Sequence, residues 1–150
     1  MPSVTDITVQ LPGGQLMVQD AGPPGGLAVL VYDGSTGSRL LSPAALRQAC
    51  GKGLRLIGVD PPGYGGSTPR PGRTVADGAA DASAIARALG IAKLAVWGIS
   101  AGGPTALACA ALLPDRPGLR GPAARPGLRR LACSRLSAPT ASRAWISSIP

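Results

Sequence analysis

The stretch Leu94-Ala-Val-Trp-Gly-Ile-Ser-Ala-Gly-Gly103 decides the fold of this chain, because an apolar run enters a glycine-rich turn with a serine at its tip. Residues 98–102 satisfy the pattern G-x-S-x-G, and the helix-compatible segment 105–113 follows them. Glycine two residues to either side of Ser100 lets neighbouring backbone approach closely and leaves the hydroxyl exposed on a strained turn. This order of strand, turn and helix favours a nucleophile elbow over an ordinary glycine-rich loop.

The segments before this stretch alternate between strands and helices. Predicted strands span residues 5–11, 15–20, 27–32 and 54–59, and predicted helices span residues 43–50 and 75–89. The first two strands form a ribbon with a turn at Gly13-Gly14. Such alternation predicts an α/β fold, with a mostly parallel sheet and helices on both of its faces.

Both predicted helices carry recognisable end signals. Ser42 caps the first helix, which begins with proline and is expected to close at Gly51. The second helix ends at Gly90. Its thin apolar face is predicted to consist of Ala76, Ala79, Ala80, Ser83, Ala84, Ala86 and Leu89.

The charge of the chain divides it into two parts. The 150 residues, 45% of them hydrophobic, suffice for one domain, and the net charge is +8. Residues 1–116 hold nine basic and seven acidic side chains, whereas residues 117–150 hold six arginines and no acid. Proline and glycine also recur every few residues after Asp115. We therefore expect part of a folded domain over residues 1–116 and a basic, disordered tail over residues 117–150.

Several classes of protein do not fit this composition. Cys50, Cys109 and Cys133 are too scattered for a disulfide framework, and a chain with no histidine and no C-x-x-C spacing predicts no metal site or other cofactor. We see no signal peptide, and a reduced, cytoplasmic protein is the plain expectation. The tail lacks aromatic residues interleaved with its arginines, which argues against specific nucleic-acid binding. Nothing in the sequence indicates the oligomeric state.

The uncharged segment 94–113 is long enough for a membrane span. Its middle, however, contains Gly98, Ser100, Gly102, Gly103 and Pro104, which break a spanning helix. A buried strand followed by a buried helix is therefore favoured over a membrane span.

Two further loops match a known family in order and spacing. Asp33-Gly-Ser-Thr-Gly37 follows the strand 27–32, in a slot that in the α/β-hydrolase family typically reads H-G-x-P-G. Asp60-Pro-Pro-Gly-Tyr-Gly-Gly-Ser67 follows the strand 54–59 and matches D-x-P-G-x-G-x-S. With the G-x-S-x-G turn, these loops make residues 5–116 resemble the N-terminal half of an α/β-hydrolase domain of the esterase- and peptidase-like kind.

This resemblance implies acyl transfer by an activated serine acting on a small-molecule ester, amide or related carbonyl. Ser100 is the implied nucleophile, and the backbone N–H groups of Ala101 and Ser35 are the implied oxyanion hole. Gly98, Gly102 and Gly34 are expected to support the turn and the loop beside it. The positive end of the following helix would favour negative charge at the same place.

The other half of such a site is missing. The family supplies an acid and then a histidine after the nucleophile, but this chain has no histidine, and Asp115 follows the helix too closely to serve as that acid. Lys93 would lie at the far end of the strand from Ser100. We expect a truncated or frame-altered copy with little activity alone; the alternative is a non-catalytic binding module that keeps the pocket.

Other conspicuous side chains have plainer interpretations. Asp60 is expected to shape a structural turn rather than to take part in chemistry, and Tyr64 to face solvent rather than substrate. Arg39 is expected to pack, with an acid or a substrate carboxylate as the alternative partner. Trp97 is expected in the core, and Trp145 is expected to be exposed.

Overall fold

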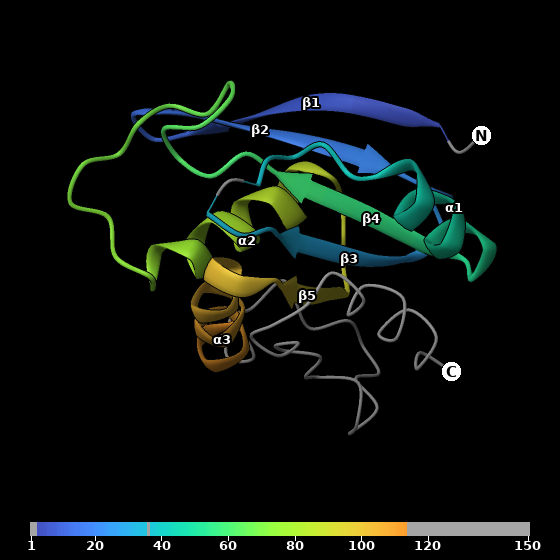
Figure 1. The fold of residues 1–150 in the computed structure, drawn as a ribbon. Coiled ribbons are helices and arrows are strands. Elements are labelled where there is room, and N and C mark those ends of the chain that lie inside the picture. The colour runs from blue at the N-terminus through green and yellow to red at the C-terminus, as the bar shows by residue number, and fades with distance from the viewer. Residues whose placement is uncertain (1–2, 36, 114–150) are drawn as a thin grey trace.

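The computed structural model describes residues 3–35 and 37–113, which form a five-stranded sheet with helices on both faces (Figure 1). The strands are β1 (Val4–Leu11), β2 (Gly14–Ala21), β3 (Leu27–Tyr32), β4 (Leu54–Val59) and β5 (Leu94–Gly98). The helices are α1 (Pro43–Gly51), α2 (Asp77–Ala88) and α3 (Gly103–Leu112), and a 3-10 turn, η1 (Ser100–Gly102), precedes α3. The α/β class expected from the sequence is confirmed.

The sheet is mixed, with strand order β1-β2-β4-β3-β5. The N-terminal ribbon pairs antiparallel as predicted, but β2 also pairs antiparallel with β4, so the ribbon continues the main sheet. The β4–β3 and β3–β5 pairs are parallel. The carboxyl ends of β3, β4 and β5, each followed by one of the three sequence motifs, therefore meet at one edge of the sheet.

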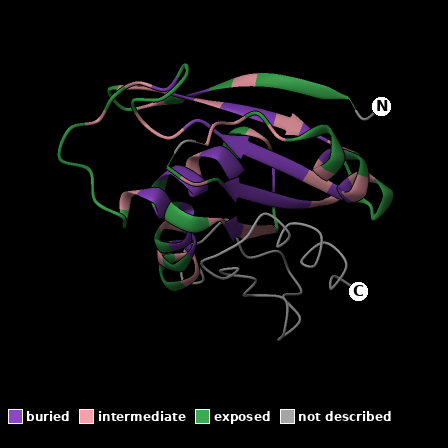
Figure 2. Cartoon of the chain, viewed as in Figure 1, coloured by how far each residue is buried: buried purple, intermediate pink, exposed green. Residues whose placement is uncertain are grey.

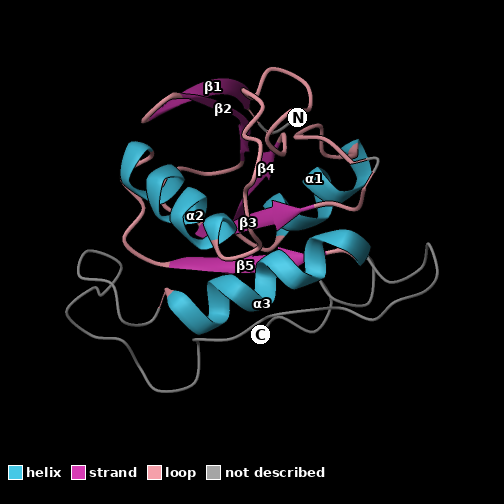
Figure 3. Ribbon diagram, turned by 90° about the vertical axis from the view of Figure 1, so that its left-hand side faces the viewer, coloured by secondary structure: helices cyan, strands magenta, loops and turns pink. Residues whose placement is uncertain are grey.

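Two apolar clusters, one on each face, hold the layers together (Figure 2). On one face α2 and Cys109 of α3 cover side chains such as Leu30 and Ile57. On the other face α1 packs on a cluster that includes Val31 and Trp97. Figure 3 shows α1 and α2 on opposite sides of the central strands. The near-continuous apolar character of β3 follows from this burial on both faces.

Helix α1 begins as predicted and ends one residue later than predicted, at Gly51. Ser42 accepts a hydrogen bond from the backbone N–H of Ala45 at 3.2 Å, and Pro43 is the first helical residue. Gly51 lies inside the helix, however, and the left-handed glycine that follows the helix is Gly53, at φ 68°. Gly53 rather than Gly51 is therefore the residue that permits the chain to turn away.

The buried face of α2 differs from the predicted apolar stripe. The helix begins at Asp77, Ala80 is exposed, and Asp81 is buried. Asp81 forms ion pairs with Arg70 and Arg73, which lie in the long loop before the helix. A rule that seeks apolar residues at helical spacing misses a buried acid whose charge is neutralised from a distant loop. Gly90, at φ 64°, follows the helix end as predicted.

The uncharged segment 94–113 forms strand β5, the turn and helix α3, as expected. The helix is not buried throughout, however: Gly103, Ala106 and Cys109 are buried, whereas Leu107 and Leu112 are exposed. Among the described residues, no helix is both long and apolar enough to cross a membrane. Cys50 and Cys109 are free thiols. The expected tail, with Cys133 and Trp145, lies outside the described residues.

Candidate active site

Ser100 stands at the junction of β5 and α3 in a strained backbone conformation. Ile99 is extended, and Ser100 then turns to φ 49°, the one positive φ at a non-glycine position within residues 3–35 and 37–113. A left-handed conformation costs an L-residue about 1–2 kcal/mol, so it persists only where the surroundings impose it. Ser100 and Ala101 are both exposed, which leaves the serine side chain accessible.

The glycines beside Ser100 are required by space rather than by their own φ values. A Cβ on Gly98 would lie 2.5 Å from the carbonyl oxygen of Gly102 and 2.8 Å from the Cβ of Ala106. A Cβ on Gly102 would collide with the carbonyl oxygen of Tyr32. The turn is thus packed directly against the end of β3, as the spacing of the two glycines suggests.

The loop after β3 lies against Ser100. The backbone N–H of Ile99 donates to the carbonyl oxygen of Tyr32 at 2.9 Å. A Cβ built on Gly34 would be 3.4 Å from the Cβ of Ser100 and 3.8 Å from its Oγ. Gly37 N–H donates to the carbonyl oxygen of Gly34 at 2.7 Å, which folds the loop tightly. The structure therefore brings Gly34 and Ser100 together.

The two candidate oxyanion donors flank this contact in sequence. Ala101 follows Ser100, and Ser35, also exposed, follows Gly34. Within the described part of the chain, neither backbone N–H has a protein acceptor. Ala101 lies in the turn that leads directly into α3, whose N-terminal N–H groups and dipole favour negative charge.

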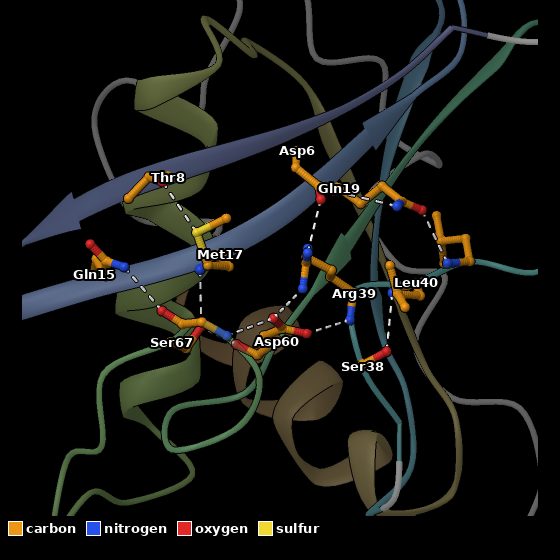
Figure 4. Close-up of polar contacts among 12 residues, drawn as sticks. Asp6, Thr8, Gln15, Met17, Gln19, Ser38, Arg39, Leu40, Asp60 and Ser67 are labelled. Atoms are coloured by element: carbon orange, nitrogen blue, oxygen red, sulfur yellow. Dashed lines mark hydrogen bonds and ion pairs between the residues drawn. The ribbon is translucent and has the colours of Figure 1, made fainter.

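A buried ion pair joins the loop after β3 to the loop after β4 (Figure 4). Asp60 is fully buried and accepts three hydrogen bonds: from the Arg39 backbone N–H at 2.8 Å, from Arg39 Nη1 at 2.8 Å and from the Gly66 N–H at 3.2 Å. Arg39 Nη2 donates to Asp6 on β1 at 2.8 Å. Nη1 and Nη2 of the guanidinium are thus engaged by two protein carboxylates, the acid partner that the sequence left open.

The contacts of Arg39 favour the charged forms of Arg39 and Asp6. Hydrogen bonding to Asp6, and then to Asp60, raises the pKa of Arg39 against the opposing effect of burial. The hydrogen bond from Arg39 in turn lowers the pKa of Asp6 below its usual value. Asp60 therefore shapes its turn, as expected, but the sequence did not predict its link to Arg39.

Comparison with known proteins places this architecture in a family. The sequence profile described as "alpha/beta hydrolase fold" matches residues 24–116, which is more than half of the chain. The chain belongs to the α/β-hydrolase family. The loops after β3, β4 and β5, which carry the three sequence motifs, all lie within the matched residues.

Solved α/β hydrolases share the fold over only part of their length. An epoxide hydrolase from an endophytic Streptomyces is 29% identical, with a TM-score of 0.63, and the match covers 75% of this chain and 34% of that one. An α/β hydrolase fold protein from Chitinophaga pinensis is 27% identical, with a TM-score of 0.65 and coverage of 75% and 41%. A predicted CIB-like hydrolase from Thermoplasma acidophilum is 15% identical, with a TM-score of 0.67 and coverage of 77% and 59%. The chain therefore spans about a third to three fifths of the length of these structures. Among curated proteins, no match to the sequence was found.

The other side chains singled out in the sequence of this α/β-hydrolase family member lie away from Ser100 or pack elsewhere. Lys93 precedes β5, whereas Ser100 follows it, so the two stand at opposite ends of the strand. Tyr64 is 54% exposed, and Trp97 is buried in the core on the α1 face. Asp33 turns its carboxylate back on its own loop, where it accepts the Gly34 N–H at 2.7 Å.

Possible metal-binding clusters were sought among the described side chains. Within residues 3–35 and 37–113, no three ligating side chains of the His, Cys, Asp or Glu type come together. The full sequence contains no histidine.

Proposed function

We propose that this chain carries the nucleophile and the oxyanion-binding part of a serine hydrolase site. Ser100 Oγ attacks the carbonyl carbon of a small-molecule ester or amide and forms an acyl-enzyme, which water then hydrolyses. The N–H groups of Ala101 and Ser35 hold the negative oxygen of the tetrahedral intermediate. The observation that carries this proposal is the positive φ of Ser100, at the start of α3 and in contact with Gly34.

The similar structures include epoxide hydrolases, and the chemistry of serine argues for a carbonyl substrate instead. Attack by a serine oxygen on an epoxide carbon would give an alkyl ether. An ether has no carbonyl for water to attack, so the enzyme could not return to its free form. An acyl-serine ester keeps its carbonyl and can be hydrolysed, which makes esters and amides the proposed substrate class.

Turnover by residues 1–150 alone is expected to be slow, because the proton of Ser100 has no histidine to accept it. Loss of the catalytic histidine in a serine triad costs about 10⁶ in turnover, and the oxyanion hole and substrate binding retain about 10³–10⁴ over water. A chain that binds ester substrates without turning them over would instead be a binding module with the same pocket.

We also propose that residues 117–150 come from a shifted reading frame, because the composition of the chain changes near Asp115. Residues 117–150 contain no acid and six arginines, as expected for a shifted reading frame. Translation of the other two frames downstream tests this: a frame with an acid followed by a histidine supports it. If neither frame contains such a pair, the frame shift is excluded.

Chemical rescue tests the proposed nucleophile directly. The protein is incubated with a fluorophosphonate, with and without added imidazole as an external base, and the modified residue is located by peptide mass spectrometry. We expect slow modification of Ser100 that imidazole accelerates, and none at this position in Ser100→Ala. Absence of label on Ser100 even with imidazole would exclude the nucleophile, and cooperative melting with saturable ester binding would then favour the binding module.

A further inference from the structure

We propose that Asp60 is a positioning residue for the oxyanion loop, here defined as residues 33–35 and 37–39. Acting through Arg39, Asp60 fixes this loop against Ser100, and through Gly66 and Ser67 it fixes the loop after β4 in the same frame. The inference rests on the proposed function in one respect, which is the role of the Ser35 N–H as an oxyanion donor.

The oxyanion loop is held at both ends and by different neighbours. At its start, Tyr32 accepts the Ile99 N–H at 2.9 Å, which ties β3 to the turn that carries Ser100. At its end, Asp60 accepts both the backbone N–H and Nη1 of Arg39, each at 2.8 Å. Between these anchors, the described hydrogen bonds are local ones, from Gly34 to Asp33 and from Gly37 to Gly34. Release of the Arg39 anchor would therefore leave Gly34 and Ser35 held from one side only.

The backbone of Arg39 also lies directly on the sheet. A Cβ on Gly58 of β4 would collide with the carbonyl oxygen of Arg39, so this crossing requires glycine. The position of Asp60, two residues after Gly58, places its carboxylate under the same crossing. The ion pair and the close approach thus fix Arg39 to the carboxyl end of β4 together.

Asp60 organises the second loop with the same side chain and its own carbonyl. Its carboxylate accepts the Gly66 N–H at 3.2 Å, and its carbonyl oxygen accepts from the Ser67 hydroxyl at 2.7 Å. Ser67 Oγ in turn accepts the Met17 N–H of β2 at 2.9 Å (Figure 4). Asp60 therefore connects the oxyanion loop and the loop after β4 through its carboxylate, and it reaches strand β2 through its carbonyl oxygen and Ser67.

The negative charge of Asp60 is needed as well as its shape. All three of its donors come from the protein, and one of them is a guanidinium. In Asp60→Asn, one acceptor oxygen becomes an N–H₂ group that faces donors, and Arg39 loses the buried one of its two counter-charges while it keeps Asp6. We expect the Arg39 end of the oxyanion loop to detach first.

Asp81 offers a matched control for this substitution. It is a second buried aspartate paired with two arginines, Arg70 and Arg73, but it lies on α2 and holds the loop before that helix. Asp81→Asn therefore removes a comparable ion pair without touching residues 33–35 and 37–39. Arg39→Lys provides a second test at the site, because it keeps the backbone N–H and one charge but cannot pair with both Asp60 and Asp6.

Two measurements on the full chain separate positioning from general stability. Hydrogen exchange at the Gly37 N–H, which bonds to Gly34, is compared with exchange at Leu30 in the core of β3. Phenylboronic acid is then titrated, because Ser100 Oγ can donate an electron pair to boron while its proton passes to solvent, which leaves a tetrahedral anion in the proposed hole.

We expect Asp60→Asn to raise Gly37 exchange about tenfold or more relative to Leu30 and to weaken boronate affinity about tenfold. Arg39→Lys should change the exchange ratio and the boronate affinity in the same directions by less. Asp81→Asn should leave the exchange ratio and the affinity within about twofold of the parent protein. Equal changes in Asp60→Asn and Asp81→Asn, or an unchanged Gly37 ratio in the two variants at the site, would overturn the inference. If the parent protein forms no boronate adduct, the proposed function fails, and the Gly37 ratio alone decides the positioning role.

Discussion

A Cβ added to Gly34 would reach Ser100 at van der Waals distance, 3.4 Å from the Cβ of Ser100 and 3.8 Å from its hydroxyl oxygen, so the glycine leaves room beside the serine. Gly34 in the loop after β3 therefore borders the space around the serine and places no side chain in it.

Substitution at Gly34 should block access to Ser100. Gly34→Ala adds a methyl group at ordinary contact distance, and it should reduce imidazole-assisted phosphonylation by no more than a few fold. Gly34→Val adds two further methyl groups over the hydroxyl, and we expect a loss of about tenfold or more with little change in melting temperature. Equal labelling rates for the two variants would show that Gly34 does not border the reacting atom.

The strained backbone at Ser100 should be measurable as stability. Ser100→Ala removes the hydroxyl but keeps the Cβ at φ 49°, whereas Ser100→Gly removes the steric cost of the left-handed conformation. Urea unfolding should therefore find Ser100→Gly more stable than Ser100→Ala by about 1 kcal/mol. If Ser100→Ala equals or exceeds Ser100→Gly, the strain is not present in solution.

The glycines of the chain should differ sharply in their tolerance of alanine. A Cβ on Gly102 would meet the Tyr32 carbonyl oxygen, which is backbone and cannot swing aside. Gly102→Ala should lower the free energy of unfolding by about 1–3 kcal/mol. Gly51, at the end of α1, has open space around it and serves as the control, where alanine should be neutral or stabilising by up to about 1 kcal/mol.

The two described cysteines should react at different rates. Cys109 is buried in α3, and burial, together with the negative charge of Asp81, raises its pKa to about 12. Cys50 in α1 is partly exposed. Because the thiolate is the reactive form, iodoacetamide near neutral pH should alkylate Cys50 and spare Cys109 until the protein unfolds. Peptide mass spectrometry checks this, and early alkylation of Cys109 would show that α3 does not pack on α2 as described.

The fold was predictable where local patterns and burial agree. The apolar runs of β3 and β4 gave their bounds directly, because a strand buried on both faces has few polar residues. Ser42-Pro43 predicted the start of α1, because a serine hydroxyl that caps a helix and a proline at its first position are typical of helix N-termini. The proximity of Gly34 to Ser100 followed from two neighbouring parallel strands with loops at the same end.

Long-range polar contacts were not predictable from the same patterns. Asp60 with Arg39, and Asp81 with Arg70, join residues that lie 21 and 11 positions apart, and no local spacing reveals such a pair. The antiparallel pairing of β2 with β4 was also missed, since a hairpin pattern specifies its own partner but not the next strand. The sole sequence signal for the pair of Arg39 and Asp60 was their position: Arg39 lies two residues after the motif of residues 33–37, and Asp60 begins the motif of residues 60–67.

The pH dependence of Ser100 phosphonylation tests the central claim most directly, which is that the chain presents a shaped nucleophile without an internal base. The rate at Ser100, followed by peptide mass spectrometry with Ser100→Ala as the blank, should rise steadily with pH between about 6 and 9, because hydroxide alone removes the proton. A plateau with a midpoint near neutral pH would reveal a general base acting on Ser100 and would contradict the account.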